Sequence, residues 1–254
     1  PWWAMPISAG ETLAIDTPRS GARSYVAFAG GIDVPIAIGS RATDVKGGFG
    51  GLAGRGLSRG DRLKLNPAQC ALMPGGIGAA VEERRCVPGD TAHLRVLPAS
   101  EFGTFTQQAQ TAFTQTEWTV TNDANRMGYR LAGETLTLSK PLELLSHGIV
   151  PGTVQVPPAG QPIIQLAEAN TCGGYPKIAT VISADLPALG RLRPGAKLTF
   201  AAVTVEEAQA LRRRQEADLA ALAARLTPVA RTYMPDLEKL FSHNLVSGAV
   251  DARE

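Results

Sequence analysis

The sequence has 254 residues, a formal net charge of +2, and 44% hydrophobic against 19% charged residues. This length can bury a substantial core, and the composition is ordinary for a globular protein. So small a net charge gives no support for binding to nucleic acid or to a membrane surface. No stretch approaches the roughly twenty apolar residues of a membrane-spanning helix. We therefore expect neither a nucleic-acid partner nor a membrane partner.

The three cysteines and three histidines are far apart in the sequence. Because no Cys-x-x-Cys pair or His cluster with metal-ligand spacing occurs, the sequence predicts no disulfide framework and no metal site. Cysteines without disulfide or metal-ligand spacing favour a reducing compartment. No signal peptide is recognisable at the start of the sequence. We therefore expect a cytoplasmic protein, with a processed or truncated N-terminus because the chain starts without Met.

Short strands and turns are predicted up to about residue 203. Apolar, often alternating segments at 12–16, 24–30 and 62–66 are bounded by Gly, Pro or Asp, which is typical of strands. Four segments also share a Gly followed by two residues and a Leu, which predicts hairpin corners where Gly takes a positive φ. These glycines are Gly10, Gly60, Gly133 and Gly195. Such repeated corners favour one β-barrel or a pair of barrels.

Two helices are predicted among these strands and after them. Residues 105–113 form a short helical pattern, and residues 205–226 place Ala and Leu at helical spacing before Pro228. The Gly-rich and then charged stretch 74–90 predicts a boundary. The sequence therefore predicts a mainly β protein with a few short helices and a C-terminal helix. Its predicted domains are a first β subdomain (1–85), a β-barrel (86–204) and a C-terminal helix and tail (205–254).

Two motifs before residue 131 leave alternatives open. The Gly-rich stretch 47–56 lacks the Lys-Ser/Thr end of a phosphate loop, so it is either a turn or a loop that covers a ligand. Arg126 and Arg130 share one face of an extended chain and could bind a carboxylate or phosphate. Solvated arginines on a surface strand explain the same spacing.

The stretch from Ser146 to Val181 combines Gly/Pro turns with polar side chains inside apolar strands. His147 could transfer a proton near neutral pH or only stabilise a turn. Lys177 could bind an anion or lie in solvent. Cys172 has no flanking base, and we expect it to be buried and inert. These residues predict a polar, turn-built site without defining its chemistry.

Several long motifs, in order along residues 8–205, resemble one family. They are GARSYVAFAGGIDVPIAIGSRATD, GFGGLAGRGLSRGD, NRMGYRLAG, SHGIVPGTVQVPPAGQPIIQLAE and CGGYPKIATVISADLPALGRLRPG. The chain is similar to the allophanate hydrolase subunit 2-type, or biotin-dependent carboxyltransferase-like, family. The resemblance implies a cyclophilin-like β-barrel. Members of the family usually carry a further N-terminal stretch, which this sequence lacks.

The resemblance also implies a reaction and partners. The reaction is the ATP-dependent opening of 5-oxo-L-proline to L-glutamate, with ATP alone or with Mg²⁺ as cofactor. The partners are a B-type protein, which is similar to allophanate hydrolase subunit 1, and a TIM-barrel-like A-type protein. Two alternatives stay open: the carboxyltransferase half of a urea-carboxylase-like enzyme, which would need biotin, and a non-enzymatic regulatory module.

The resemblance and the polar turns together select the expected site residues. We expect His147, Lys177 and Glu168 to be catalytic, although Glu168 stands where the family more often has Asp. Residues expected to bind substrate or nucleotide are Asn125, Arg126, Gln155, Thr171, Gly173, Gly174 and Tyr175.

Overall fold

The computed structural model describes residues 3–18, 21–68, 77–78 and 91–228. The chain forms two compact units. The described residues of the first are 3–12, 25–68, 77–78 and 227–228, and those of the second are 13–18, 21–24 and 91–226. Both units are discontinuous in sequence. The division into the ranges 1–85, 86–204 and 205–254 stays a prediction. Most of the predicted boundary stretch 74–90 lies outside the described residues.

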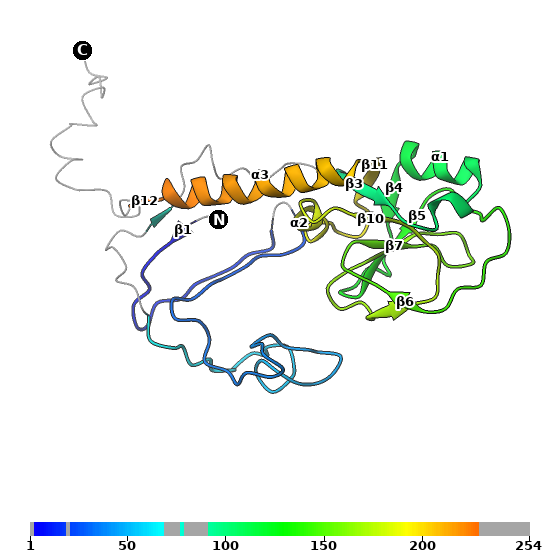
Figure 1. Cartoon of the computed structure of the whole chain (residues 1–254). Helices are drawn as coiled ribbons and strands as arrows, with labels where there is room; N and C mark the ends of the chain where they lie inside the picture. The colour runs from blue at the N-terminus through cyan, green and yellow to red at the C-terminus, as the bar shows by residue number, and fades with distance from the viewer. Residues whose placement is uncertain (1–2, 19–20, 69–76, 79–90, 229–254) are drawn as a thin grey trace, which may run out of the picture. The chain divides into compact units, whose positions relative to one another are not determined.

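Seven strands of the second unit close a barrel in the order β10-β3-β11-β4-β5-β8-β7 (Figure 1). Neighbouring strands are antiparallel, except that β11 runs parallel to β3. This confirms the predicted mainly β fold with a barrel. The strands are β3 (Thr91–Pro98), β4 (Trp118–Val120), β5 (Gly128–Ala132), β7 (Thr153–Gln155), β8 (Ile163–Gln165), β10 (Lys177–Val181) and β11 (Lys197–Ala202).

Large apolar side chains fill the core of this unit. Trp118 is fully buried, and its indole N–H donates to the carbonyl oxygen of Phe113 at 3.2 Å. Phe113 stacks on Phe200 of β11 with ring centroids 4.4 Å apart, so helix α1 (Gln107–Gln115) packs against the barrel. This confirms the helix predicted at 105–113. Thr106 caps it by accepting a hydrogen bond from the backbone of Ala109.

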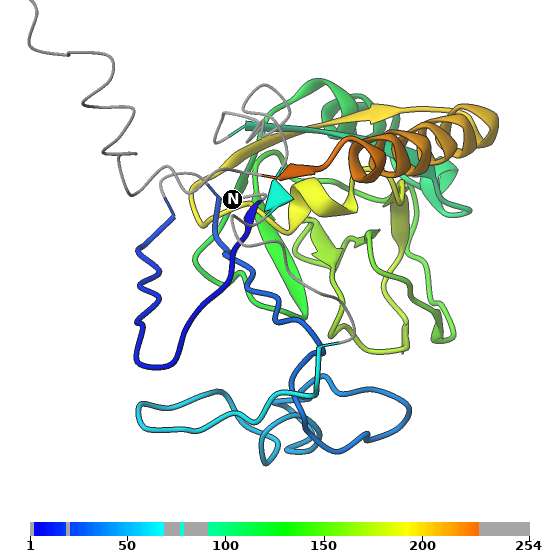
Figure 2. The same cartoon turned by 90° about the vertical axis from the view of Figure 1, so that its left-hand side faces the viewer.

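The predicted C-terminal helix is α3 (Val205–Ala224), and it begins at a capping box. The Thr204 hydroxyl accepts from the Glu207 backbone at 3.2 Å, and the Glu207 carboxylate accepts from the Thr204 backbone at 2.8 Å. Figures 1 and 2 show α1 (green) and α3 (orange) on the same side of the barrel. Shorter helical turns are η2 (Phe102–Thr104) and α2 (Leu186–Leu189). None of the helices in the described ranges is long and apolar enough to span a membrane.

The predicted hairpin corners are partly correct. Gly10, Gly60 and Gly195 have positive φ values of 86°, 95° and 86°, but only Gly195 leads into a strand, β11. Gly133 instead packs on Trp118, where an added Cβ would lie 2.5 Å from the ring. Its missing side chain therefore serves close packing and not a left-handed turn.

The strands predicted at 12–16, 24–30 and 62–66 were wrong. None of these segments forms a strand, and Leu65, within 62–66, makes only an isolated bridge to Ile32. An alternating segment becomes a strand only when a neighbouring strand pairs with its backbone. The small sheet of the first unit instead consists of β1 (Trp3–Ala4), β2 (Ile77–Gly78) and β12 (Thr227–Pro228).

The Asp185 side chain links the start of α2 to strand β3 through hydrogen bonds. Its carboxylate accepts hydrogen bonds from Arg95 through the backbone N–H at 2.7 Å, Nε at 2.9 Å and Nη2 at 2.6 Å, and Asp185 is only 7% exposed. We expect Asp185→Asn to lower the free energy of unfolding by about 2–3 kcal/mol, because charged hydrogen bonds are lost at a buried position. Urea denaturation measures this change.

Glu216→Gln is the control for Asp185→Asn. Glu216 pairs with Arg212 at 2.8 Å on α3, but its side chain is 58% exposed. Exposed pairs of this kind contribute about 0.5 kcal/mol or less. Equal effects of the two substitutions would contradict the stabilising role of Asp185.

Candidate functional site

Two short strands pair with each other outside the closed barrel and form a two-stranded ribbon. It consists of β6 (His147–Gly148) and β9 (Cys172–Gly173), in which His147 is opposite Gly173. A Cβ added to Gly173 would lie 2.9 Å from the Gln155 amide nitrogen, so the ribbon approaches strand β7 closely. Figure 1 shows β6 on the opposite side of the barrel from α1 and α3.

Lys177 begins β10 beneath this ribbon. It is only 7% exposed, and its Nζ lies 3.5 Å from the carbonyl oxygen of His147. Burial lowers the pKa of the Lys177 ammonium, and the nearby Glu101 carboxylate opposes that shift. The structure therefore presents Lys177 as a nearly buried cation that loses its proton more easily than an exposed lysine.

Glu101 is a site residue that the sequence did not reveal. One carboxylate oxygen accepts from the Lys177 backbone N–H at 3.1 Å, the other lies 3.7 Å from His147 Nε2, and the Ser100 hydroxyl donates to it. Burial acts to raise the pKa of Glu101. The hydrogen bonds from Ser100 and Lys177 and the charges of His147 and Lys177 outweigh burial and hold this pKa below its ordinary value. Glu101 is therefore a carboxylate at neutral pH.

His147 has a contact at each ring nitrogen. Nδ1 lies 3.2 Å from the carbonyl oxygen of Leu145, which can only accept, so Nδ1 carries a hydrogen. Nε2 faces the Glu101 carboxylate at 3.7 Å. The His147 side chain is 40% exposed, so a ligand in solvent can reach it. This geometry is compatible with the predicted proton transfer.

Gln155 is almost fully buried, and its amide is satisfied within the protein. It accepts from the Gln165 amide at 2.9 Å and donates to the carbonyl oxygen of Tyr175 at 3.3 Å. The Tyr175 side chain is 48% exposed and contributes only its backbone to this contact. Gln155 therefore joins β7, β8 and the turn before Lys177. Its predicted ligand contact stays a prediction.

Arg126, Glu168 and Asn125 form a second group. Arg126 Nη2 and Glu168 Oε1 are 2.6 Å apart, and the Glu168 backbone donates to the Arg126 carbonyl oxygen at 3.2 Å. The Asn125 side chain accepts from the Met127 backbone at 2.8 Å. These contacts join Glu168 to Arg126 and not to His147 or Lys177. The Arg126 side chain is 61% exposed, and its charge is already paired with that of Glu168. The binding role expected of Arg126 and the catalytic role expected of Glu168 both stay predictions.

The remaining predicted residues shape the ribbon through their backbone. The Thr171 carbonyl oxygen accepts from the Ile149 N–H at 2.9 Å, and an added Cβ on Gly174 would lie 3.3 Å from the Leu144 carbonyl oxygen. The prediction that Cys172 is buried was wrong, because its thiol is exposed. Successive residues of a strand point to opposite faces, so Cys172 points away when Gly173 faces Gln155.

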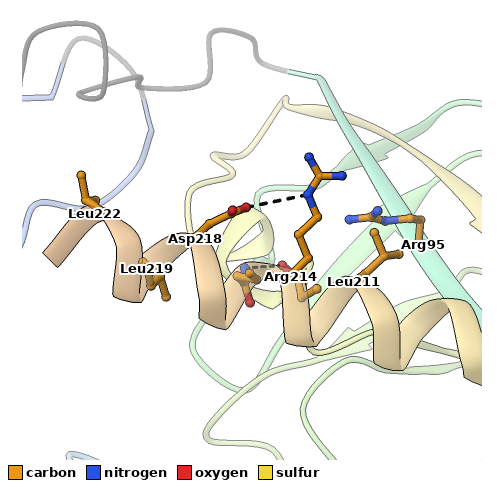
Figure 3. A pocket seen from close by; sticks show the side chains of 8 residues that line it. Arg95, Leu211, Arg214, Asp218, Leu219 and Leu222 are labelled. Carbon is orange, nitrogen blue, oxygen red and sulfur yellow. Dashed lines mark hydrogen bonds and ion pairs between the residues drawn. The ribbon is translucent and has the colours of Figure 1, made fainter. Parts of the chain in front are cut away.

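Two hollows flank α3, and neither is lined by a predicted site residue. Figure 3 shows the smaller, about 330 Å³, with Arg95 of β3 and Leu211 and Arg214 of α3 around it. Arg214 pairs with Asp218 across one helical turn at 4.0 Å. The larger, about 590 Å³, lies between the first half of α3 and the end of β10. Among the predicted site residues, His147 and Lys177 lie together and both contact Glu101, so we take these three residues as the candidate site.

Comparisons with known proteins agree with this architecture. The chain is 42% identical over 224 residues to the C-type subunit of 5-oxoprolinase from Escherichia coli, a match that covers 88% of this chain and 70% of that protein. It is 43% identical over 215 residues to the corresponding 5-oxoprolinase subunit from Haemophilus influenzae, a match that covers 85% of this chain and 67% of that protein.

A solved structure shares the fold at lower sequence identity. The crystal structure of the K. lactis urea amidolyase superposes with a TM-score of 0.72 at 23% identity, over 84% of this chain and 14% of that one. Residues 1–202 match the family model described as carboxyltransferase domain, subdomain A and B. The chain therefore belongs to the family of carboxyltransferase domains, subdomains A and B.

Proposed function

We propose that the chain is the C-type subunit of a 5-oxoprolinase, which opens 5-oxo-L-proline to L-glutamate with hydrolysis of ATP. The observation that carries this proposal is the 42% identity along 70% of the Escherichia coli protein. The cluster of Glu101, His147 and Lys177 supports it, because such a reaction needs positive charge and a proton carrier at one place. The use of ATP favours the cytoplasm.

The chemistry explains why these groups are suited to the reaction. A lactam is a poor electrophile, and a phosphoryl group from ATP on its oxygen makes it a better one. The Lys177 ammonium would stabilise the negative charge on that oxygen, where burial strengthens its effect. A water molecule would add to the activated carbon, and His147 would deliver a proton from Nε2 to the ring nitrogen as the C–N bond breaks, with Glu101 stabilising the imidazolium. A second water would then hydrolyse the resulting acyl phosphate to the carboxylate of glutamate and free phosphate.

The chain fits part of a phosphate contact. Lys177 supplies a cation, whereas the space beside Gly173 is occupied by Gln155 and that beside Gly174 by the Leu144 carbonyl oxygen. No group of three or more His, Cys, Asp or Glu side chains that could hold a metal occurs among residues 3–18, 21–68, 77–78 and 91–228. We assign ATP to the assembled enzyme, and no Mg²⁺ ligand among the residues in these ranges.

Reconstitution tests the proposed function. The chain is combined with the B-type and TIM-barrel-like A-type proteins, and glutamate and phosphate are measured with ATP and 5-oxo-L-proline. We expect release of both products in the complete mixture, and no glutamate when any one component is left out. Absence of glutamate release from the complete, folded mixture would overturn the proposal.

The first unit carries apolar side chains that a partner would cover. Tyr25 is 86% exposed, Ile36 61%, Ile38 89% and Leu57 64%. Large apolar side chains that are this exposed are candidates for contact with a partner. We expect the chain to elute with the B-type protein as a complex in size-exclusion chromatography.

Charge at this surface should break the complex. We expect Tyr25→Glu combined with Ile36→Glu to weaken the association about tenfold or more, because a carboxylate at the buried core of an interface is desolvated. Leu219→Glu on α3, where Leu219 is 53% exposed, is the control. Full activity of the chain alone as a monomer would contradict the need for a partner.

The carboxyltransferase function stays a second candidate, because the family model bears that description. In that reaction Lys177 would bind a carboxylate in place of a phosphate. Biotin would then be required, so activity would depend on bicarbonate and a biotinylated carrier and would be blocked by avidin. A regulatory module would bind its partner without turnover in either assay.

A further inference from the structure

A separate pocket lies within the first unit. Its volume is about 350 Å³, and residues between Gly30 and Asn66 line it. Sites for small molecules have volumes of this order or larger, with mostly apolar walls and a few polar groups. None of the candidate catalytic or ligand-binding residues lines this pocket, and only Leu57 is shared with the exposed apolar residues assigned to a partner.

Two glycines bring the walls of this pocket together. A Cβ added to Gly30 would lie 2.2 Å from the Asn66 carbonyl oxygen, and one added to Gly51 would lie 1.9 Å from the Thr43 hydroxyl. Both glycines also have positive φ values, 81° and 52°. Only glycine fits at such approaches. The Gly-rich stretch 47–56, which the sequence left open as a turn or a ligand-covering loop, thus contributes a wall of the pocket.

Strained backbone adjoins the pocket on two sides. Ile38 and Ala53 have positive φ values of 49° and 55°, which non-glycine residues rarely adopt. Ala53 directly follows the lining residue Leu52, and Ile38 lies in a turn closed by two hydrogen bonds between Ala37 and Ser40, just before Arg41. Backbone strain of this kind gathers at ligand sites, where the surrounding structure maintains it.

The charge of the pocket comes from one side chain. Among the residues that line it, Arg41 is the only ionised one, and its Nε donates to the Val34 carbonyl oxygen at 3.2 Å. That bond anchors the guanidinium and leaves its terminal nitrogens as donors. Acidic neighbours are engaged elsewhere, since Asp33 pairs with Lys64 at 3.4 Å and Asp61 with Arg55 at 2.8 Å.

The other lining groups define the rest of the ligand. The Thr43 hydroxyl and the Asn66 amide supply further hydrogen-bonding groups, and apolar side chains form the remaining wall. A bare inorganic anion would leave this apolar wall unused, and a neutral apolar molecule would leave Arg41 unpaired. The apolar lining residues are Ile32, Val34, Leu52, Leu57 and Leu63.

We propose that this pocket binds a small organic carboxylate. The carboxylate contacts the Arg41 guanidinium, whose planar donors match its two oxygens. The apolar body of the ligand lies against Ile32, Leu52 and Leu63 and is removed from water. The proposal is independent of the reaction assigned to Lys177, because the two sites share no residue.

Calorimetric titration of the full chain with hexanoate tests the proposal. Hexanoate is a probe that combines one carboxylate with a short apolar body. We expect saturable binding, which Arg41→Met weakens about tenfold or more because the length is kept and the charge is lost. Arg62→Met, which changes an exposed arginine of the same unit, is the matched control and should leave binding unchanged.

Two further experiments test the carboxylate charge and the apolar contacts separately. Hexanamide lacks the charge and inorganic phosphate lacks the apolar body, so each should bind more weakly than hexanoate. Leu52→Trp should block binding by filling the pocket while Arg41 stays in place, with folding checked by circular dichroism. No saturable binding of hexanoate, or equal effects of Arg41→Met and Arg62→Met, would overturn the proposal.

Discussion

We expect Lys177→Ala to lower glutamate release by the assembled enzyme about 100-fold, because removal of one group that stabilises transition-state charge has effects of this size. Lys177 is nearly buried beside Glu101 and the β6–β9 ribbon, so solvent screens its charge only weakly. The loss should fall on kcat more than on KM, since the charge on the substrate oxygen develops during the reaction.

The controls for this substitution separate charge from packing. Lys177→Met keeps the length of the side chain and should be as inactive as Lys177→Ala. Lys197→Ala removes an exposed lysine of β11, whose Nζ lies 3.2 Å from the Glu117 carboxylate. This variant should retain activity. A folded Lys177→Met enzyme with the wild-type rate would exclude a catalytic role for the Lys177 charge.

We expect Glu101→Gln to lower kcat about 10- to 30-fold, because the amide keeps the shape of the side chain but removes the charge beside His147. Glu101 acts here as a positioning residue through Lys177 and His147. Rescue by the conservative variant distinguishes this role from a purely structural one: Glu101→Asp keeps the charge and should recover part of the rate, with KM near the wild-type value in both variants. An unchanged rate in Glu101→Gln would refute the positioning role.

The same substitution should have a pH-dependent effect on stability. The pKa of folded Glu101 lies below its ordinary value, so its stabilising contribution is complete above the ordinary carboxyl pKa and is lost as the pH falls through the folded value. Glu101→Gln should therefore melt below the wild type at pH 7, and the gap should narrow in acid. Thermal melts from pH 7 to pH 3 measure this gap, and a gap that stays constant would contradict the assignment.

The sequence by itself determined those features that depend on local pattern. Helical spacing and an N-terminal cap define α3, and a short apolar and polar pattern defines α1. Long motifs, read in order, indicated the family and the mainly β fold. The polar residues between Ser146 and Val181 indicated a site, because polar groups within apolar strands need partners.

Only the tertiary structure decided which of these groups meet. Antiparallel pairing places Ala179 of β10 opposite Pro98 of β3, so the turn after β3 carries Glu101 to the backbone of Lys177. No local pattern encodes that register, because it depends on strands far apart in the sequence. The same reason explains why the segments 12–16, 24–30 and 62–66 form no strands, because strand formation depends on which distant backbone lies alongside. The pairing of Glu168 with Arg126 also depends on how segments distant in the sequence fold together.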